Sequence, residues 1–203
     1  ARTASDLIEE ASDPPLGMKP TESLRDARDA VDTLARRADG LTGFVTSYRA
    51  LLGLPEPQRT RFPLDSLIED VARMVEVEFA GRGIRLEQDV TPATLEVNAD
   101  RSLIEQVLIN LLTNAGQALE QTGGVVTLQA RLNSQGKICI DVTDDGPGIP
   151  ADVAGRMFVP FYTTRRNGSG VGLALSRQIM NAHGGSIGFT SSSGGGARFT
   201  LAF

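Results

Sequence analysis

The chain has 203 residues, a formal net charge of −5, 40% hydrophobic residues and 22% charged residues, which is an ordinary globular composition. No stretch approaches the roughly 18 apolar residues of a membrane span, no secretory signal is visible, and no basic stripe favours nucleic acid as the main partner. The single cysteine, Cys139, cannot form an internal disulfide. It fits a reducing compartment and is interpreted as a packed strand residue.

Residues 22–53 are predicted to form one long helix that ends before Pro55 and Pro57. Its apolar residues are Leu24, Ala27, Val31, Leu34, Ala38, Leu41, Val45, Tyr48 and Leu52. They recur at alternating spacings of three and four, which is typical of coiled coils and helix bundles. A single helix cannot bury this seam, so we expect a hairpin partner and a homodimer through the hairpin. We assign residues 1–58 to this partial hairpin and 59–203 to a second domain.

The second domain is predicted to begin with a linker, a helix and two strands. The linker is LPEPQRTRF (54–62), and the apolar spacing that follows predicts a helix over 64–81. A strand is predicted over 84–90, and a short strand near 94–97.

A row of amides marks the next predicted helix, which runs over 100–120 with Asp100 as its N-cap. Asn110 and Asn114 stand four residues apart, and Gln106 and Gln117 extend the same stripe along an otherwise apolar helix. A buried amide without a partner costs about 1–3 kcal/mol, so a row of amides suggests a ligand. Amide oxygens suit Mg²⁺ and the phosphates that it carries. Satisfied core amides and an exposed polar edge remain the alternatives.

Alternating apolar residues predict strands over 126–132, 138–142, 187–189 and 199–203. Strict alternation indicates one packed face and one unpacked face, which is typical of a mostly antiparallel sheet. We therefore predict an α+β fold, a two-layer α/β sandwich in which the helices cover the packed face of a mixed, mostly antiparallel sheet.

The segment DDGPGIP (144–150) follows the strand that ends at Val142 and is held by glycine and proline. A carboxylate at its mouth could accept a hydrogen bond from an exocyclic amine such as that of adenine. It could instead coordinate a metal or cap the turn, and a turn of this composition is more often only a turn.

Glycines at 168, 170 and 172 open a predicted helix over 171–181, where backbone N–H groups and the helix dipole favour an anion. The spacing matches neither the dinucleotide fingerprint nor the P-loop. Arg165 and Arg166 stand just before it and could reach phosphates, with a solvated surface pair as the alternative. The preceding segment MFVPFYTT (157–164) is interpreted as the anchor of a lid, or else as a small hydrophobic cluster under a loop.

In this order the segments N-x-x-x-N-A (110–115), D-D-G-P-G-I (144–149), F-V-P-F (158–161) and G-S-G-V-G-L (168–173) resemble the ATP-site motifs of bacterial sensor histidine kinases. The resemblance covers 60–203, and the long helix followed by LPEPQ and RFPL resembles the nitrogen-regulation type. It implies the Bergerat-type ATP fold of the GHKL superfamily, which is shared with gyrase, mismatch-repair ATPases and the heat-shock chaperone ATPase.

The resemblance also implies roles for individual residues. Asn114 would hold Mg²⁺ through its side-chain oxygen, with Asn110 beside it toward the phosphates. Asp145 would accept from the adenine amine, Gly148 would let the ring approach the backbone, and Thr200 would assist near adenine. The implied ATP-binding set is Asn110, Asn114, Gln117, Asp145, Gly148, Ile149, Phe161, Thr163, Thr164, Arg165, Gly168, Ser169, Gly170, Val171, Gly172, Leu173 and Thr200.

Asn110 and Arg165 are the expected catalytic residues, and Arg165 stands where members of the family often carry a lysine. ATP-hydrolysing relatives place a glutamate, the general base for water, four residues before the Mg²⁺-binding asparagine. That position is Asn110 here, and an amide cannot take a proton. The resemblance therefore favours phosphoryl transfer to a protein group over hydrolysis.

The family's acceptor histidine lies in an H-E/D-x-x-N/T-P-like segment on the first hairpin helix, and this chain has no such segment. Its one histidine, His183, precedes Gly184 and Gly185 and is interpreted as a structural residue at a helix end. We interpret the chain as a fragment that begins after the phosphoacceptor.

The leading hypothesis is the catalytic core of a two-component sensor histidine kinase, with ATP and Mg²⁺ as cofactors and a response-regulator receiver domain as partner. We expect a bacterial, cytoplasmic location and no membrane contact within this chain, with anchoring of the parent protein left open. One alternative is a protein-serine kinase or anti-sigma regulator of the same fold. Another is a nucleotide-binding pseudokinase scaffold that signals by dimerising.

Overall fold

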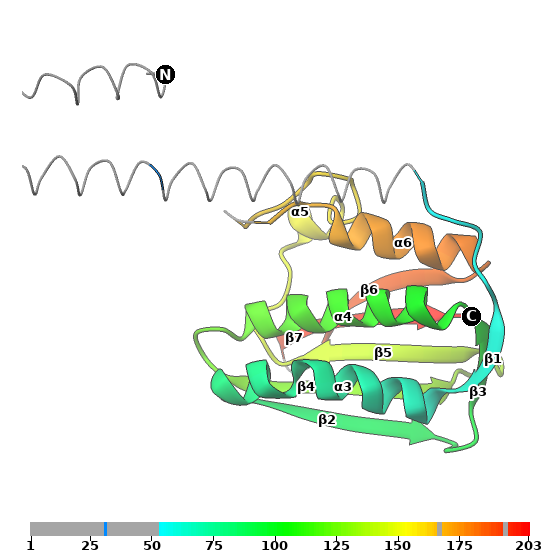
Figure 1. Cartoon of the computed structure of the whole chain (residues 1–203). Helices are drawn as coiled ribbons and strands as arrows, with labels where there is room; N and C mark the ends of the chain where they lie inside the picture. The colour runs from blue at the N-terminus through cyan, green and yellow to red at the C-terminus, as the bar shows by residue number, and fades with distance from the viewer. Residues whose placement is uncertain (1–30, 32–52, 166–167, 193–194) are drawn as a thin grey trace, which may run out of the picture. The chain divides into compact units, whose positions relative to one another are not determined.

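The computed structural model describes residues 31, 53–165, 168–192 and 195–203 (Figure 1). Val31 is helical. The rest of the helix predicted over 22–53, apart from Gly53, lies outside the described residues. The chain divides into two compact units, 1–46 and 47–203. The domain boundary expected after residue 58 stays a prediction.

The second unit contains a five-stranded mixed sheet and a separate two-stranded ribbon. Its elements are β1 (Thr60–Pro63), α3 (Leu64–Gly81), β2 (Ile84–Thr91), β3 (Glu96–Ala99), α4 (Arg101–Ala118), β4 (Gly124–Leu132), β5 (Ile138–Asp144), α5 (Ala151–Ala154), α6 (Gly172–Ala182), β6 (Ser186–Ser192) and β7 (Gly195–Ala202). The sheet has the order β2-β4-β5-β7-β6, and β1 pairs with β3. Among the described strands, β2 and β4 form the one parallel pair, which confirms the mixed, mostly antiparallel sheet.

Helices α3, α4 and α6 lie side by side over one face of the sheet, which confirms the predicted two-layer sandwich (Figure 1). Apolar residues of α3 at helical spacing, among them Leu64, Leu67 and Val71, are buried against this layer. Ile140 and Val142 of β5 point into the same core. Among the helices that the structure describes, none is long and apolar enough to cross a membrane.

The opposite face of the sheet is polar and carries a hydrogen-bonded group on its central strands. Asp141 of β5 accepts from Arg131 Nε at 2.8 Å and from Thr200 Oγ1 at 2.5 Å. Cys139 lies on the same side of β5 and is buried, which confirms it as a packed strand residue. Burial raises the pKa of the Cys139 thiol and therefore favours its neutral form.

Four features in particular differ from the sequence prediction. The segment treated as a linker contains β1, whose Phe62 pairs with Val97 of β3, and β3 itself begins at Glu96 rather than near residue 94. The four-residue helix α5 was not predicted. Strand β5 continues two residues beyond Val142, as far as Asp144. Four-residue elements are too short to show a period, and β1 depends on a partner more than thirty residues away in the sequence.

Candidate functional site

Helix α4 presents its amides along one edge of its buried face. Asp100 is its N-cap, as predicted, because Asp100 Oδ1 accepts from the backbone N–H groups of Ser102 and Leu103 at 3.1 and 3.2 Å. Asn110 and Asn114 are half-buried, whereas Gln106 and Gln117 are exposed. The stripe therefore runs along the rim of the core, and only its two asparagines are partly withdrawn from water.

Asn110 joins α4 to the start of α6. Its Nδ2 donates to Ser176 Oγ at 3.0 Å. A Cβ atom at Gly172 would lie 2.2 Å from Asn110 Oδ1, so any other residue there would require the Asn110 side chain to shift. The amide thus lies directly beside the N-terminus of the predicted anion-binding helix.

Arg165 lies over Asn114. The guanidinium approaches Asn114 Oδ1 at 3.4 Å and donates to the Asn114 carbonyl oxygen at 3.1 Å. The residue as a whole is exposed, but desolvation of its guanidinium lowers the pKa of Arg165, against the opposing effect of the Glu120 and Asp144 carboxylates. A cation, an amide oxygen and two carboxylates therefore lie within electrostatic reach of one another.

The two aspartates at the end of β5 have different surroundings. Asp144 is only 6% exposed, and its Oδ1 accepts from the N–H groups of Gly146 at 3.0 Å and Ala197 at 3.3 Å. Burial raises the pKa of Asp144, while these two hydrogen bonds act in the opposite direction. Asp145 is exposed, and its Oδ1 accepts from the Val125 N–H group at 2.8 Å.

The segment between α5 and α6 is closed by a backbone hydrogen bond from Phe161 N to Gly170 O at 2.8 Å. Both residues have a left-handed backbone, with φ of 66° each. A Cβ atom at Gly170 would lie 2.5 Å from the Phe161 carbonyl carbon, so glycine is required there. Within this loop Thr163 Oγ1 accepts from the Arg165 N–H group, and Ser169 Oγ accepts from that of Val171. Thr164 and Gly168 are exposed.

The N-terminus of α6 faces this loop. Its N-cap is Val171, which is buried and provides no side-chain cap, so among the described residues the cap itself offers the first N–H groups of the helix no side-chain acceptor. Leu173 is half-buried and packs against the core. The N–H groups at a helix N-terminus are suited to binding phosphate.

A hollow of about 500 Å³ lies where the end of α4 meets the turn after β5. It is lined by Gln117, Ala118, Glu120, Gln121, Thr122, Gly123, Asp145, Gly146 and Pro147. Gly148, which follows the lining residue Pro147 in the sequence, has φ of 75°, and a Cβ atom there would lie 3.4 Å from the Gly196 carbonyl oxygen. Ile149 is half-buried against the core. The structure thus brings Gln117 and Asp145 to one hollow.

The family model for histidine kinase-, DNA gyrase B- and HSP90-like ATPases matches residues 99–203, which is just over half of the chain. The chain belongs to this ATPase family. It is 35% identical over 176 residues to the sensor histidine kinase ZraS of Escherichia coli O157:H7, a match that covers 87% of this chain and 38% of ZraS. It is 34% identical over 165 residues to the sensory histidine kinase/phosphatase NtrB of Vibrio alginolyticus, a match that covers 76% of this chain and 46% of NtrB.

Solved structures agree with this assignment. The catalytic domain of the histidine kinase ThkA is 32% identical, with a TM-score of 0.65 over 72% of this chain and 95% of that one. The structure of ThkA in complex with the response regulator TrrA gives a TM-score of 0.68 at 25% identity. This match covers 98% of this chain and 56% of that chain. This chain is therefore the ATPase catalytic domain of the sensor-kinase type, and it spans less than half the length of ZraS and NtrB.

Thr200, implied by the resemblance as a residue near adenine, is not brought to this ATPase site. It donates to Asp141 on the face of the sheet opposite α3, α4 and α6, whereas Asp144 lies on the side that these helices cover. The residue of β7 that contacts Asp144 is Ala197, whose backbone N–H group donates to Asp144 Oδ1. The orientation of Thr200 could have been predicted from the sequence. Phe199 and Leu201 face the core, so the residue between them on the strand must face away from it.

Asp144 and Ser176 contribute to the site and are absent from the set implied by the resemblance. Asp144 continues the alternation of Ile138, Ile140 and Val142, so extending the strand by two residues would have placed it on the packed face. No comparable pattern identifies Ser176, whose role depends on where α6 docks against α4.

The ATPase residues fit a magnesium ion that arrives with its nucleotide. Among the described residues no group of three or more histidine, cysteine, aspartate or glutamate side chains could hold a metal by themselves. Mg²⁺ typically keeps water and phosphate ligands and takes only one or two from the protein. The Asn114 Oδ1 atom, which faces the Arg165 cation, is a hard oxygen of the required kind.

Proposed function

We propose that this chain supplies the ATP-binding catalytic part of a two-component sensor histidine kinase. The γ-phosphoryl group of ATP would pass to a histidine outside this chain, with loss of ADP, and then to a response-regulator receiver domain. The observations that carry the proposal are that Asn110 lies against the first turn of α6 and that Arg165 lies over Asn114, one turn further along α4. The ThkA–TrrA complex supports the class of partner.

The two ends of the nucleotide are assigned by the chemistry of the residues. Arg165 and the N–H groups at the start of α6 would bind the phosphates, because they are positive and partly withdrawn from water. Asn114 would hold Mg²⁺, which would neutralise the phosphates. This requires Arg165 to release Asn114 Oδ1, since a guanidinium and a metal ion cannot share that position.

We assign binding of the nucleotide base to the buried Asp144 carboxylate. Both hydrogen bonds of Asp144 among the described residues go to Oδ1, so Oδ2 remains for the amine of a purine. Asp145, which the resemblance implied for this role, is the alternative, because it also lines the hollow. Gly148 would allow the ring to approach the backbone.

Two observations favour transfer to a protein group outside this chain. Asn110 donates to Ser176 and carries no group that could activate water, so hydrolysis lacks a base at this position. His183, the one histidine of the chain, is 8% exposed and has both ring nitrogens within hydrogen-bond distance of backbone groups. It therefore cannot present a free nitrogen to ATP.

The test uses a longer natural form of the protein that includes the segment preceding this chain, incubated with γ-labelled ATP and Mg²⁺. Acid-labile label on the longer form, and none on this chain, is the expected result. Acid-stable label would instead indicate a serine kinase of the same fold. Binding of ATP without any label would indicate a nucleotide-binding scaffold. We also propose a cytoplasmic, bacterial location and a homodimer formed through the hairpin.

A further inference from the structure

The N-terminus of α4 is a junction between three parts of the second unit. Asp100 caps the helix through Oδ1 and accepts from the Gln58 N–H group through Oδ2 at 2.9 Å. Its own N–H group donates to His183 Nε2 at 3.0 Å. One residue therefore contacts the linker before β1, the first turn of α4 and the end of α6.

The hydrogen bonds of His183 define the protonation state of its ring. Its Nδ1 lies 2.8 Å from the Ile179 carbonyl oxygen, which can only accept, so Nδ1 must carry hydrogen. Its Nε2 faces the N–H group of Asp100, which can only donate, so Nε2 must be bare. The geometry requires a neutral imidazole protonated at Nδ1, and no other form satisfies both backbone groups.

The linker makes a second contact with the same end of α6. Arg59 donates to the Ala182 carbonyl oxygen at 2.8 Å, which satisfies one of the carbonyl groups left unpaired at a helix C-terminus. Leu54 packs against the hydrophobic core. The linker is therefore held through Gln58 and Arg59 to both α4 and α6.

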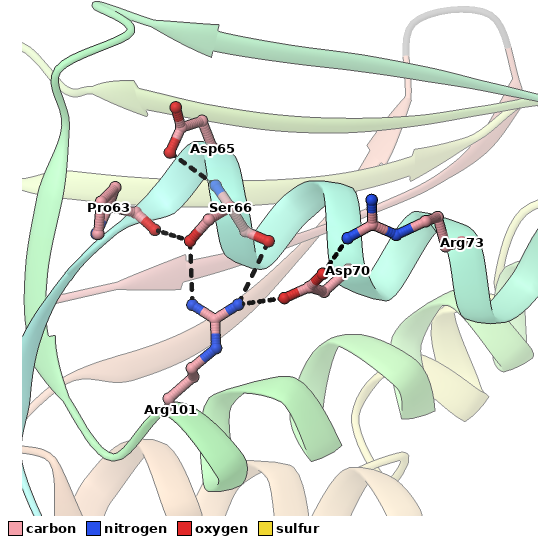
Figure 2. Close-up of polar contacts among 6 residues, drawn as sticks. All are labelled: Pro63, Asp65, Ser66, Asp70, Arg73 and Arg101. Atoms are coloured by element: carbon pink, nitrogen blue, oxygen red, sulfur yellow. Dashed lines mark hydrogen bonds and ion pairs between the residues drawn. The ribbon is translucent and has the colours of Figure 1, made fainter.

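The other side of the junction is anchored to α3, as Figure 2 shows. Arg101 donates to Ser66 Oγ at 3.1 Å, to the Ser66 carbonyl oxygen at 3.3 Å and to the Asp70 carboxylate. Its guanidinium also lies 5.4 Å from the centre of the Phe62 ring. The start of α4 is thus fixed to α3 by the Ser66 and Asp70 contacts, which involve neither Gln58 and Arg59 nor α6.

We propose that His183 is a positioning residue that, through Asp100, docks the linker onto the ATP-binding unit. The Nε2 acceptor fixes the Asp100 backbone, and this directs Oδ2 toward Gln58. The linker then moves with α4 and α6 from Gln58 onward. These are the two helices that carry Asn110, Asn114 and the glycine-flanked N-terminus. The inference does not require the chain to bind nucleotide.

The first test uses the unaltered chain. Because His183 is the one histidine, the imidazole ¹⁵N signals of the whole chain need no assignment by mutation. At neutral pH we expect a protonated Nδ1 and an unprotonated Nε2. An Nε2–H tautomer, or an imidazolium, would overturn the proposal without any variant having to fold.

The second test compares His183→Phe, which keeps the ring volume and loses the acceptor, with His183→Gln, which can reach the Nε2 position with an oxygen. Hydrogen exchange of the Gln58 and Asp100 amides should accelerate about tenfold or more in His183→Phe, and His183→Gln should largely restore protection. The amides of β5 serve as a control for general loosening. Unchanged exchange at Gln58 in a folded His183→Phe chain would overturn the docking role.

If the phenylalanine variant does not fold, Asp100→Ser addresses the same contact. Serine is a good N-cap, so α4 keeps its start, but the shorter side chain lacks the second oxygen that Gln58 uses. Faster exchange at Gln58, with the Ser102 amide still protected and faster tryptic cleavage after Arg59, would support the proposal. Retained protection of Gln58 would contradict it.

Discussion

At the scale of single residues, the end of β5 shows how two adjacent aspartates acquire different chemistry. Alternation along the strand turns Asp144 toward the helices, where burial raises its pKa, and turns Asp145 to the surface. A buried carboxylate with one oxygen held by two N–H groups is fixed in orientation, and its second oxygen can discriminate between an amine and a carbonyl group. An exposed carboxylate next to water discriminates less.

Replacing each aspartate by asparagine should therefore separate their roles. Asp144→Asn is expected to weaken ATP binding about tenfold or more, because a hydrogen bond to a charged acceptor contributes roughly 1.5–3 kcal/mol. Asp145→Asn is expected to change it less than threefold, because its charge is exposed and screened. Calorimetric titration with ATP and GTP measures the nucleotide affinity of both variants. A larger loss of ATP affinity in Asp145→Asn than in Asp144→Asn would restore Asp145 as the acceptor.

Asn114→Ala should remove the side-chain oxygen that is proposed to hold Mg²⁺. We expect Mg²⁺-dependent ATP affinity to fall about tenfold or more while binding without metal changes little, since the variant removes one metal ligand. Gln106→Ala is the matched control, because Gln106 lies on the same helix and is exposed. Equal affinity of Asn114→Ala and the unaltered chain for Mg-ATP would remove Asn114 from the metal site.

At the scale of elements, the loop between α5 and α6 depends on backbone geometry more than on side chains. Phe161 and Gly170 both have φ of 66°, and the hydrogen bond between them closes the loop. For phenylalanine this conformation is unfavourable, so neighbouring contacts must maintain it. The loop carries Thr163 and Arg165, so the position of the cation proposed to bind phosphate depends on Gly170.

Gly170→Ala should disturb this loop and leave the rest of the fold intact. Alanine at a left-handed position that also meets the Phe161 backbone is strained by about 1 kcal/mol or more. We expect weaker ATP binding with an unchanged circular dichroism spectrum. Gly188→Ala is the control, because a Cβ atom there meets nothing within 4 Å. Equal ATP affinity for both variants would show that the closed loop is unimportant for binding.

Periodicity predicted the long elements and failed for the short ones. Helices α3 and α4 and strand β4 follow from apolar spacing, and the N-cap at Asp100 follows from side-chain chemistry. By contrast, β1 exists because Phe62 reaches Val97, and no local pattern encodes a partner so distant in the sequence. Among site residues, Asn110 and Asn114 stood out as polar residues on an apolar helix. Ser176 did not, because its role arises only when α6 packs on α4.

At the scale of the whole molecule, the buried Asp144 charge is a cost to stability. A carboxylate whose folded pKa is raised contributes its full stability below its unfolded pKa of about 3.9, and this contribution is lost as pH rises through the folded pKa. At neutral pH the chain therefore retains a desolvated charge at the place proposed for the base.

The pH dependence of thermal stability tests this cost. Asparagine cannot ionise, so Asp144→Asn should gain Tm relative to the unaltered chain between pH 4 and pH 7. The same variant should lose the rise in Tm that Mg-ATP gives the unaltered chain, because binding to the folded state alone stabilises it. A Tm difference that is constant across this pH range would show that Asp144 is not desolvated in solution.

Helix α4 also limits where residues can be inserted into this sequence or deleted from it. It connects the parallel neighbours β2 and β4, and it carries the linker's docking residue at Asp100 and the amide at Asn110, about 15 Å apart along its axis. One inserted or deleted residue between them would turn the amides by about 100° relative to Asp100 and direct them away from α6. The exposed turn over 134–137 has no such restriction. Length variation is therefore tolerable in that hairpin turn and excluded from the first half of α4.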